Sequence, residues 1–145
     1  MTPPPFAGPG DPLFQPWCGT AKTLLDAAVG QAPLWWLRGS RMRTKQGLLD
    51  EWAAAAQFPP HFGSTWDALR DALSDLPEGG TFLILDADQL LQEAPPQEGL
   101  AWVAVMAAAQ EDLLPRGFHL VLQAEAPRYE ALVQGLRGLG VSLPA

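Results

Sequence analysis

Two aspartates spaced one helical turn apart are the residues of this chain best placed to do chemistry. The stretch FPPHFGSTWDALRDALSDL, residues 58–76, carries Asp67 and Asp71 behind a loop with two prolines and a glycine. A spacing of four residues places two side chains on the same face of a helix. Carboxylates fixed on a helix can bind Lys or Arg groups, with two parallel hydrogen bonds where the group is a guanidinium. The pattern therefore indicates a binding site for a cationic group.

The helix that must carry these acids is predicted from about residue 65 to 76, because its apolar residues recur at helical spacing. Its core-facing side is formed by Trp66, Leu69, Leu73 and Leu76, and its opposite side by Asp67, Asp71, Ser74 and Asp75, with Arg70 at the boundary. Ser64 and Asp67 fit a capping box, and the positive helix N-terminus stabilises an acid in the first turn. That structural role explains Asp67 but not Asp71, which lies in the second turn. We therefore expect Asp71 to have a binding role.

A second pair of acids follows a predicted strand. Asp86 and Asp88 come directly after the apolar segment TFLIL, residues 81–85. An Asp-x-Asp pair at the end of a strand is how phosphate-transferring hydrolases present a nucleophile and bind Mg²⁺, so an enzyme of this class is an alternative function. No Ser or Thr stands at the next two positions, and the chain has no lysine after Lys45 to hold a transferred phosphate. The structural interpretation is that the two aspartates end the strand and begin a turn.

We expect neither a metal site nor a cofactor. His61 and His119 are the only histidines and Cys18 is the only cysteine, which is too few clustered nitrogen or sulfur ligands for zinc. One cysteine cannot form an internal disulfide, which favours a reducing cytoplasm as the location. Residues 1–16 lack the basic and apolar regions of a signal peptide, and the longest apolar run, 100–109, is too short to cross a membrane.

The charge of the chain is uneven. The net charge is −7, and residues 46–112 carry twelve acids against a single base, Arg70, whereas residues 34–45 carry four bases and no acid. An acidic surface repels nucleic acid and attracts cationic partners, among them enzymes that act on nucleic acid. The same charge also keeps a protein soluble, which needs no partner. We therefore expect no binding of nucleic acid, no membrane partner, and a cationic protein as the partner if there is one.

The remaining elements predict one α/β domain, for which 145 residues suffice. Apolar strands are predicted at 34–37, 81–85 and 119–123, and helices at 20–29, 45–57, 65–76 and 97–114. Each pair of strands is separated by a segment long enough for a helical crossover. We therefore expect a small parallel sheet of three strands, or of four, covered by helices.

The two ends of the chain are predicted to lie outside the centre of this domain. Residues 1–33 form a Pro/Gly-rich arm, loose from 1 to 19, with one short helix, and Trp17 in the arm is a candidate docking point. The segment LWWL, residues 34–37, is continuously apolar, which is typical of a strand covered on both faces. Residues 124–145 add a helix and an edge strand at 141–144.

Residues 38–76, RGSRMRTKQGLLDEWAAAAQFPPHFGSTWDALRDALSDL, resemble the barstar family of intracellular ribonuclease inhibitors. The shared features are a turn with a glycine and a basic residue after the first strand, a Leu-Leu pair in the first helix, and a Pro-x-aromatic-Gly loop. A WDAL helix with a second acid four residues after the first follows that loop. The resemblance continues through TFLILDADQL to RGFHLVLQ and covers roughly residues 34–123. The loop and the WDALxD segment are its most specific part.

The resemblance implies a non-enzymatic inhibitor or immunity partner of a small basic ribonuclease or a ribonuclease toxin domain, monomeric when free. The second helix and the loop before it would block the active site of that enzyme. Asp71 would lie where the enzyme holds a substrate phosphate, Asp67 would support it, and His61 would pack over the catalytic groups. A later acidic contact falls near Glu111 or Asp112. The predicted partner-binding residues are His61, Phe62, Gly63, Thr65, Asp67, Arg70, Asp71, Asp75, Leu76 and Asp112.

Three positions depart from the family pattern. Thr65 stands where an Asn is usual, and His61 replaces a Tyr and adds a group that titrates near neutrality. Arg70 takes a position that is commonly aromatic or apolar, and its cation would oppose a basic enzyme or pair with Asp67 or Asp71. Arg70 is the main support for a third hypothesis, a scaffold with the barstar fold that no longer binds a ribonuclease and uses its arm or tail instead.

Overall fold

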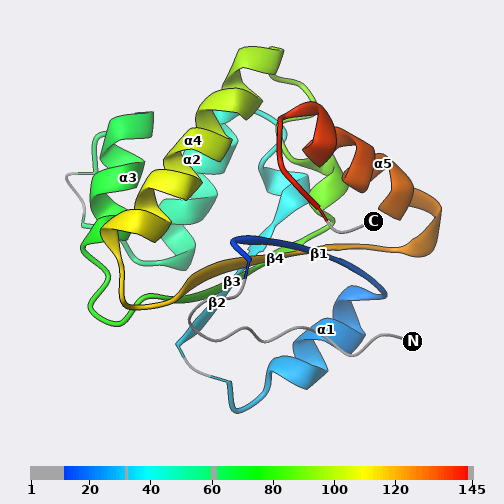
Figure 1. Ribbon diagram of the computed structural model, residues 1–145, viewed down its shortest axis with the longest axis horizontal. Coiled ribbons are helices and arrows are strands. Elements are labelled where there is room, and N and C mark those ends of the chain that lie inside the picture. Colours follow the sequence, from blue (N-terminus) through cyan, green and yellow to red (C-terminus); the bar gives the residue numbers. More distant parts are fainter. Residues whose placement is uncertain (1–11, 32, 60–61, 144–145) are drawn as a thin grey trace.

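The computed structural model describes residues 12–31, 33–59 and 62–143, which form a parallel sheet with helices on both sides (Figure 1). The strands are β1 (Phe14–Cys18), β2 (Leu34–Arg38), β3 (Gly80–Leu85) and β4 (Phe118–Ala124). The helices are α1 (Ala21–Ala28), α2 (Lys45–Ala55), α3 (Trp66–Ser74), α4 (Pro96–Asp112) and α5 (Ala126–Gly138), with short 3₁₀ turns η1 (Gly39–Arg41) and η2 (Ala87–Gln89). The strand order is β1-β4-β3-β2, and every neighbouring pair is parallel. The predicted α/β fold with a parallel sheet is confirmed.

The two central strands, β3 and β4, are mostly apolar because both of their faces are covered; their polar residues Thr81, His119 and Gln123 are buried as well. Successive side chains of a strand point to opposite faces, so Phe82 and Ile84 join one core while Leu83 and Leu85 join the other. All seven residues of β4 are buried. Continuous apolar runs of this kind are expected for parallel strands enclosed by helices.

The larger core lies between the sheet and helices α2, α3, α4 and α5, which Figure 1 shows together on one side. Its centre is aromatic. The ring of Phe82 lies 4.5 Å from that of Trp52 and 5.7 Å from that of Phe118, as measured between ring centroids. Trp102 of α4 is also wholly buried, 5.6 Å from the ring of Phe14. This core fixes α3 and α4 against the sheet and so positions the acids that they carry.

The opposite face of the sheet is covered by α1, and the prediction of a loose arm for residues 1–19 is wrong where the structure describes it. Residues 14–18 form β1, which pairs with β4 at one edge of the sheet. Trp17 is only 3% exposed and packs with Leu24 of α1, so it is a core residue and not a docking point. Gly19 leaves room for it, since a Cβ there would lie 2.3 Å from the indole. The proline content concealed this strand, although an edge strand can include a residue such as Pro16 that donates no hydrogen bond. Residues 1–11 lie outside the described residues.

The other edge of the sheet also differs from the prediction. Strand β2 is an edge strand, and Trp36 in its middle is 49% exposed, so the LWWL segment is not covered on both faces. Residues 141–143 form no strand; Val141 packs on the larger core, and residue 144 lies outside the described residues. The fourth strand of the sheet therefore comes from the N-terminal side of the chain and not from its C-terminal end.

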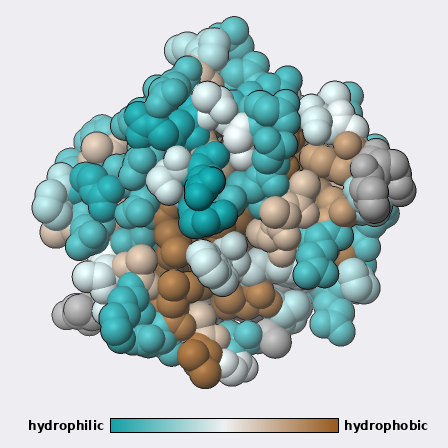
Figure 2. Space-filling model, turned by 180° about the vertical axis from the view of Figure 1, so that it is seen from behind, coloured by the Kyte–Doolittle hydropathy of each residue, from teal (hydrophilic) through white to brown (hydrophobic). Residues whose placement is uncertain are grey.

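The surface seen from behind is mainly hydrophilic, with a hydrophobic area in its lower half, the half in which α1 lies in Figure 1 (Figure 2). Val29, directly after α1, is the most exposed large apolar residue among those described, at 82%. Within the described residues, no helix combines the length and the apolar character needed to cross a membrane.

Candidate protein-binding site

Helix α3 begins at Thr65, whose hydroxyl oxygen accepts a hydrogen bond of 3.0 Å from the backbone N–H of Ala68. Thr65 is thus the N-cap, one residue later than the predicted capping box. Ser64 has a φ of 51° and lies in the left-handed region, where it turns the chain into the helix. Asp67 falls in the first turn, as predicted, and there the positive end of the helix favours its negative charge. The Thr65 hydroxyl therefore fixes where α3 begins, and with it the turns in which Asp67 and Asp71 lie.

The inner side of α3 is held firmly in the core. Leu69 and Leu73 are wholly buried against α4 and the sheet. At the start of the helix, the indole N–H of Trp66 donates to a carboxylate oxygen of Glu98 on α4 at 3.1 Å. Leu76, which we predicted to contact a partner, is only 8% exposed and supports the helix from inside. The outer side of α3 is therefore presented by a rigid element.

Three carboxylates follow one another along that outer side. Asp67, Asp71 and Asp75 are all exposed and are spaced four residues apart, which places them along one face. Among the described residues, none of the three has an ion-pair partner within 4.0 Å. Like charges at this spacing weaken a helix slightly, and the helix N-terminus explains Asp67 but not Asp71. The arrangement leaves all three free to bind cations from outside.

The one base on this face is already occupied. Arg70 donates two hydrogen bonds to Asp112 at the end of α4, with Nε–Oδ2 and Nη2–Oδ1 distances of 2.9 and 3.2 Å. The hydroxyl of Ser74 lies 2.7 Å from Asp112 Oδ2, within donating distance. The Arg70 guanidinium, followed by the Ser74 hydroxyl, lowers the pKa of Asp112 to about 2, and Asp112 in turn raises the pKa of Arg70. Of the two alternatives for Arg70, pairing with Asp67 or Asp71 is not observed: its ion pair is with Asp112 of α4, and the charges of Asp71 and Asp67 raise its pKa less than Asp112 does.

These side chains surround a hollow of about 660 Å³ on the surface. Its lining consists of Asp67, Arg70, Asp71, Ser74, Asp75 and Asp112. The lining contains four carboxylates and one guanidinium, and the guanidinium is paired with one of the four, that of Asp112. The hollow is thus a negatively charged surface built on two helices that are packed together, and it suits a cluster of Lys or Arg side chains.

The loop before α3 is described in part. Phe62 is half-buried, and its ring lies 5.1 Å from that of Phe58, so it is anchored at the surface. Gly63 and Thr65 are exposed at the start of α3, the helix that carries the acids of the hollow. His61, the predicted contact with catalytic groups, lies outside the described residues. The structure therefore brings eight of the ten predicted contact residues to one region of the surface, and places Leu76 beneath it.

The second pair of acids has a partner that the sequence did not reveal. Arg128, near the start of α5, lies 3.1 Å from Asp86 and 3.6 Å from Asp88. The backbone N–H of Asp86 also donates to Gln123 at 2.8 Å, and Asp86 has a φ of 50°. No group of three or more His, Cys, Asp or Glu in the described residues is placed to hold a metal ion. Arg128 thus forms an ion pair with both acids, with a hydrogen bond to Asp86 only, and Oδ1 of Asp88 is buried without a hydrogen-bond partner. Arg128 was missed because it lies far from both acids in the sequence, outside the resemblance.

Comparison with known families gives one result. A family model with the description "Barstar (barnase inhibitor)" matches residues 33–125, more than half of the chain. The match includes α3, the loop before it and the end of α4, and so covers the whole acidic hollow. No curated protein matches the chain closely enough to be informative.

Proposed function

The chain belongs to the barstar family, and on that basis we propose that it inhibits a small basic ribonuclease, or a ribonuclease toxin domain, by blocking its active site. The inhibitory surface is the outer side of α3 with Phe62 and Gly63 before it and the end of α4 beside it. His61 is included in this proposal as a contact from the same loop. The role needs an intracellular chain that meets the enzyme before export or on uptake, and it needs neither a metal nor a catalytic group.

The observation that carries the proposal is the state of Asp71. Its carboxylate is exposed, it has no ion-pair partner among the described residues, and it belongs to a helix held in the core by the wholly buried Leu69 and Leu73. A carboxylate held in this way can take the place of a phosphate between the Arg and Lys groups of a nuclease. Because the helix is already ordered, little conformational entropy is lost when the partner binds.

Arg70 does not prevent this role. Its guanidinium is directed to Asp112, so its charge is largely balanced within the hollow. The partner therefore meets a surface that is net negative, and complementary charge speeds its encounter with a basic enzyme. The hypothesis of a scaffold that has lost ribonuclease binding depended chiefly on a free Arg70 cation, and this pairing weakens it.

The test is a stoichiometric titration of enzyme activity. Purified chain is added to a fixed concentration of barnase and, separately, of other guanyl-specific ribonucleases and ribonuclease toxin domains. For at least one enzyme, activity should fall in a straight line to near zero at one inhibitor per enzyme. Folded chain that inhibits none of them at tenfold excess would contradict the proposal and favour the scaffold hypothesis.

The hydrolase alternative is tested on the same preparation. It requires Mg²⁺-dependent turnover of a phosphate ester that is lost on substituting Asp86→Asn. We expect no such turnover because Arg128 is paired with both aspartates on which that chemistry would depend.

A further inference from the structure

Strand β2 lies at one edge of the sheet, and the backbone groups in its middle have no partner on the outer side. On the inner side, the carbonyl of Pro33 accepts a hydrogen bond from the N–H of Thr81. On the outer side, the N–H of Arg38 donates to the carboxylate of Glu51 on α2 at 2.9 Å. Because the direction of the backbone groups alternates along a strand, those of Trp36, two residues before Arg38, also point outward. Neither the N–H nor the carbonyl of Trp36 has a hydrogen-bond partner in the described part of the chain.

This edge lacks the features that usually keep edge strands from pairing with another chain. Charged residues and prolines protect most exposed edges, and residues 34–37 contain neither. The one charge of the strand, on Arg38, is balanced by two side-chain hydrogen bonds to Glu51, of 2.9 and 3.1 Å. Trp36 is 49% exposed, on the same face as Leu34, which packs on the smaller core. The edge is therefore apolar and uncharged, with free backbone groups at its centre.

The neighbouring helix leaves space beside the edge. A hollow of about 450 Å³ lies between β2 and α2, and Trp35 and Trp36 line it on the strand side. On the helix side it is lined by Ala54 and Ala55, whose short side chains do not reach over the strand. A further strand can thus approach β2 along its outer side.

We propose that two copies of this chain pair through their β2 strands, antiparallel about a two-fold axis at Trp36, and so join their sheets into one. The two Trp36 residues lie opposite each other, and each donates its N–H to the carbonyl of the other. Trp35 then lies opposite Leu37, and Leu34 lies opposite Arg38, so that no like charges face each other across the pair. The N–H of Arg38 keeps its bond to Glu51.

A second copy fits this edge because the edge complements itself. In a two-fold interface the same residue supplies the donor and the acceptor, and the residue with both groups free is Trp36. The pairing also covers two half-exposed indoles with each other, which stabilises aromatic pairs beyond the area they bury. The resemblance implies a monomer, whereas this edge favours a weak dimer, because two short strands bury less than the about 1,200 Å² of a stable interface.

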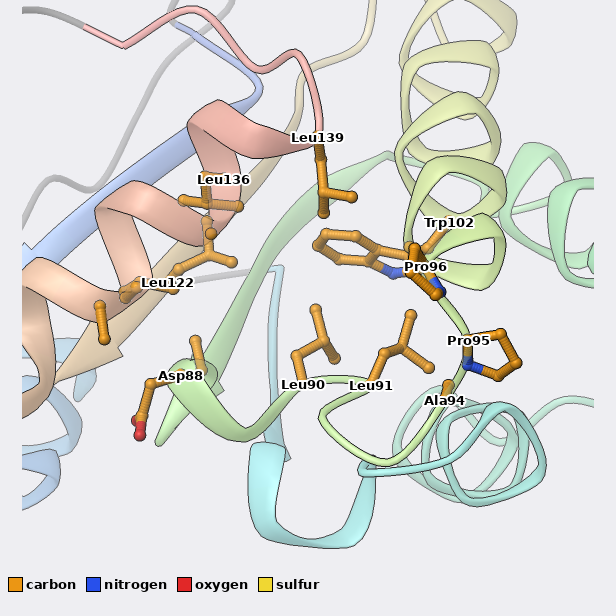
Figure 3. Close-up of a pocket in the computed structure, with 15 residues that line it drawn as sticks. Asp88, Leu90, Leu91, Ala94, Pro95, Pro96, Trp102, Leu122, Leu136 and Leu139 are labelled. Carbon is orange, nitrogen blue, oxygen red and sulfur yellow. The ribbon is translucent and has the colours of Figure 1, made fainter.

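The pocket of about 210 Å³ between the turn after η2, α4 and α5 offers no comparable group (Figure 3). Two polar atoms of its residues lack a hydrogen-bond partner among the described residues, the indole nitrogen of Trp102 and Oδ1 of Asp88, and both are buried. The carboxylate of Asp88 also points away from Leu90 and Leu91 (Figure 3) and lies 3.6 Å from Arg128. The free groups of β2 are therefore the clearer indication of a partner.

The dimer is tested by sedimentation equilibrium of the free chain without any ribonuclease, so its outcome does not depend on the inhibitor proposal. The average mass should rise from 15.6 kDa toward twice that value as the concentration increases, with a Kd of about 1 mM or tighter. A mass that stays at that of one chain up to several millimolar would overturn the pairing and leave the edge to a strand of another protein.

Two exposed apolar residues provide a matched pair of variants. Trp36→Lys places a charge in the middle of the edge and should weaken the dimer at least tenfold. Leu100→Lys makes the same change of charge on α4, at a residue that is 54% exposed, and should leave the Kd within twofold. Thermal unfolding of both variants shows whether the fold is kept. Equal Kd values for the two variants would show that the chains associate through another surface and would contradict the proposal.

Hydrogen exchange tests the register of the pair. The backbone N–H of Trp36 is free in the single chain and bonded in the dimer, so its exchange with solvent should slow as the concentration rises. An exchange rate that does not change while the mass doubles would overturn the two-fold axis at Trp36.

Discussion

Replacing Asp71 with Asn is the sharpest perturbation of the proposed inhibitory surface, because it removes one negative charge and keeps the shape of the side chain. In the complex, a carboxylate about 4 Å from a cation gains about 4 kcal/mol at an effective dielectric constant of about 20. Desolvation of the two groups offsets part of that gain. A remaining contribution of about 2 kcal/mol, the usual threshold of an interface hot spot, corresponds to a Kd about 30-fold weaker. We expect the loss for Asp71→Asn to reach at least that value.

The assay is the inhibition constant of each variant against the ribonuclease that the wild-type chain inhibits, measured at low and at high salt. Asp26→Asn is the matched control: it removes the same charge from an exposed acid on α1, on the opposite side of the sheet. It should change the inhibition constant less than about threefold, since only a distant charge is lost. The difference between the two variants should persist at high salt if Asp71 is in direct contact with the enzyme, because buried pairs are screened little. Thermal unfolding of both variants shows whether the fold is kept.

Two results would exclude Asp71 as a direct contact with the enzyme. Asp71→Asn could inhibit as well as the wild type, which would show that its carboxylate does not contact the enzyme. Alternatively, Asp26→Asn could lose as much as Asp71→Asn, which would show that only the overall charge of the chain matters. In either case the proposed surface on α3 would be wrong even if the chain inhibits a ribonuclease.

Three further predictions concern the fold that presents this surface. Asp112 has a pKa of about 2 in the folded chain against 3.8 for an unperturbed carboxyl, so its pairing with Arg70 stabilises the fold above about pH 3.8 and is lost as the pH falls toward 2. In urea unfolding, the difference in unfolding free energy between wild type and Asp112→Asn should therefore shrink as the pH falls through that range. A constant difference would contradict the pairing. Thr65→Ala should lower the free energy of unfolding by about 1 kcal/mol through loss of the N-cap, whereas Thr65→Ser should keep most of it. Trp17→Ala should lower the free energy of unfolding by about 3 kcal/mol or more, because Trp17 is buried under α1. Val29→Ala, at an exposed site, should lower it by less than about 0.5 kcal/mol. Equal losses of stability would argue against the observed packing of β1.

The centre of the fold could be predicted from the sequence because its signals are strong and local. Strands β3 and β4 each contain an apolar run, residues 82–85 and 120–122, and α3 has apolar residues on one side and acids on the other. Each of these patterns follows directly from what the element must bury. The direction in which Asp71 faces was predictable for the same reason, since Leu69 and Leu73 determine which side of α3 faces the core.

The edges of the fold were harder to predict because edge strands bury less and tolerate unusual residues. Strand β1 contains Pro16 and follows a proline-rich segment, so its composition favours a loop; only pairing with β4 makes it a strand. The ion pair between Arg70 and Asp112 could not be predicted from the sequence either. It depends on where the last turn of α4 passes α3, which brings Asp112 within 2.9 Å of a residue 42 positions earlier in the chain. Contacts of this kind are set by helix packing, for which local sequence gives no signal.

In the proposed complex, a carboxylate on α3 occupies the place of an RNA phosphate in the enzyme's active site. This placement is tested most directly by measuring the Kd of the chain for the ribonuclease at increasing concentrations of a mononucleotide that fills that phosphate site. The apparent Kd of the chain should rise in proportion to the mononucleotide concentration once that concentration exceeds the mononucleotide's own Kd, because the two cannot bind together. An apparent Kd that stays constant while the site is saturated with mononucleotide would contradict this placement.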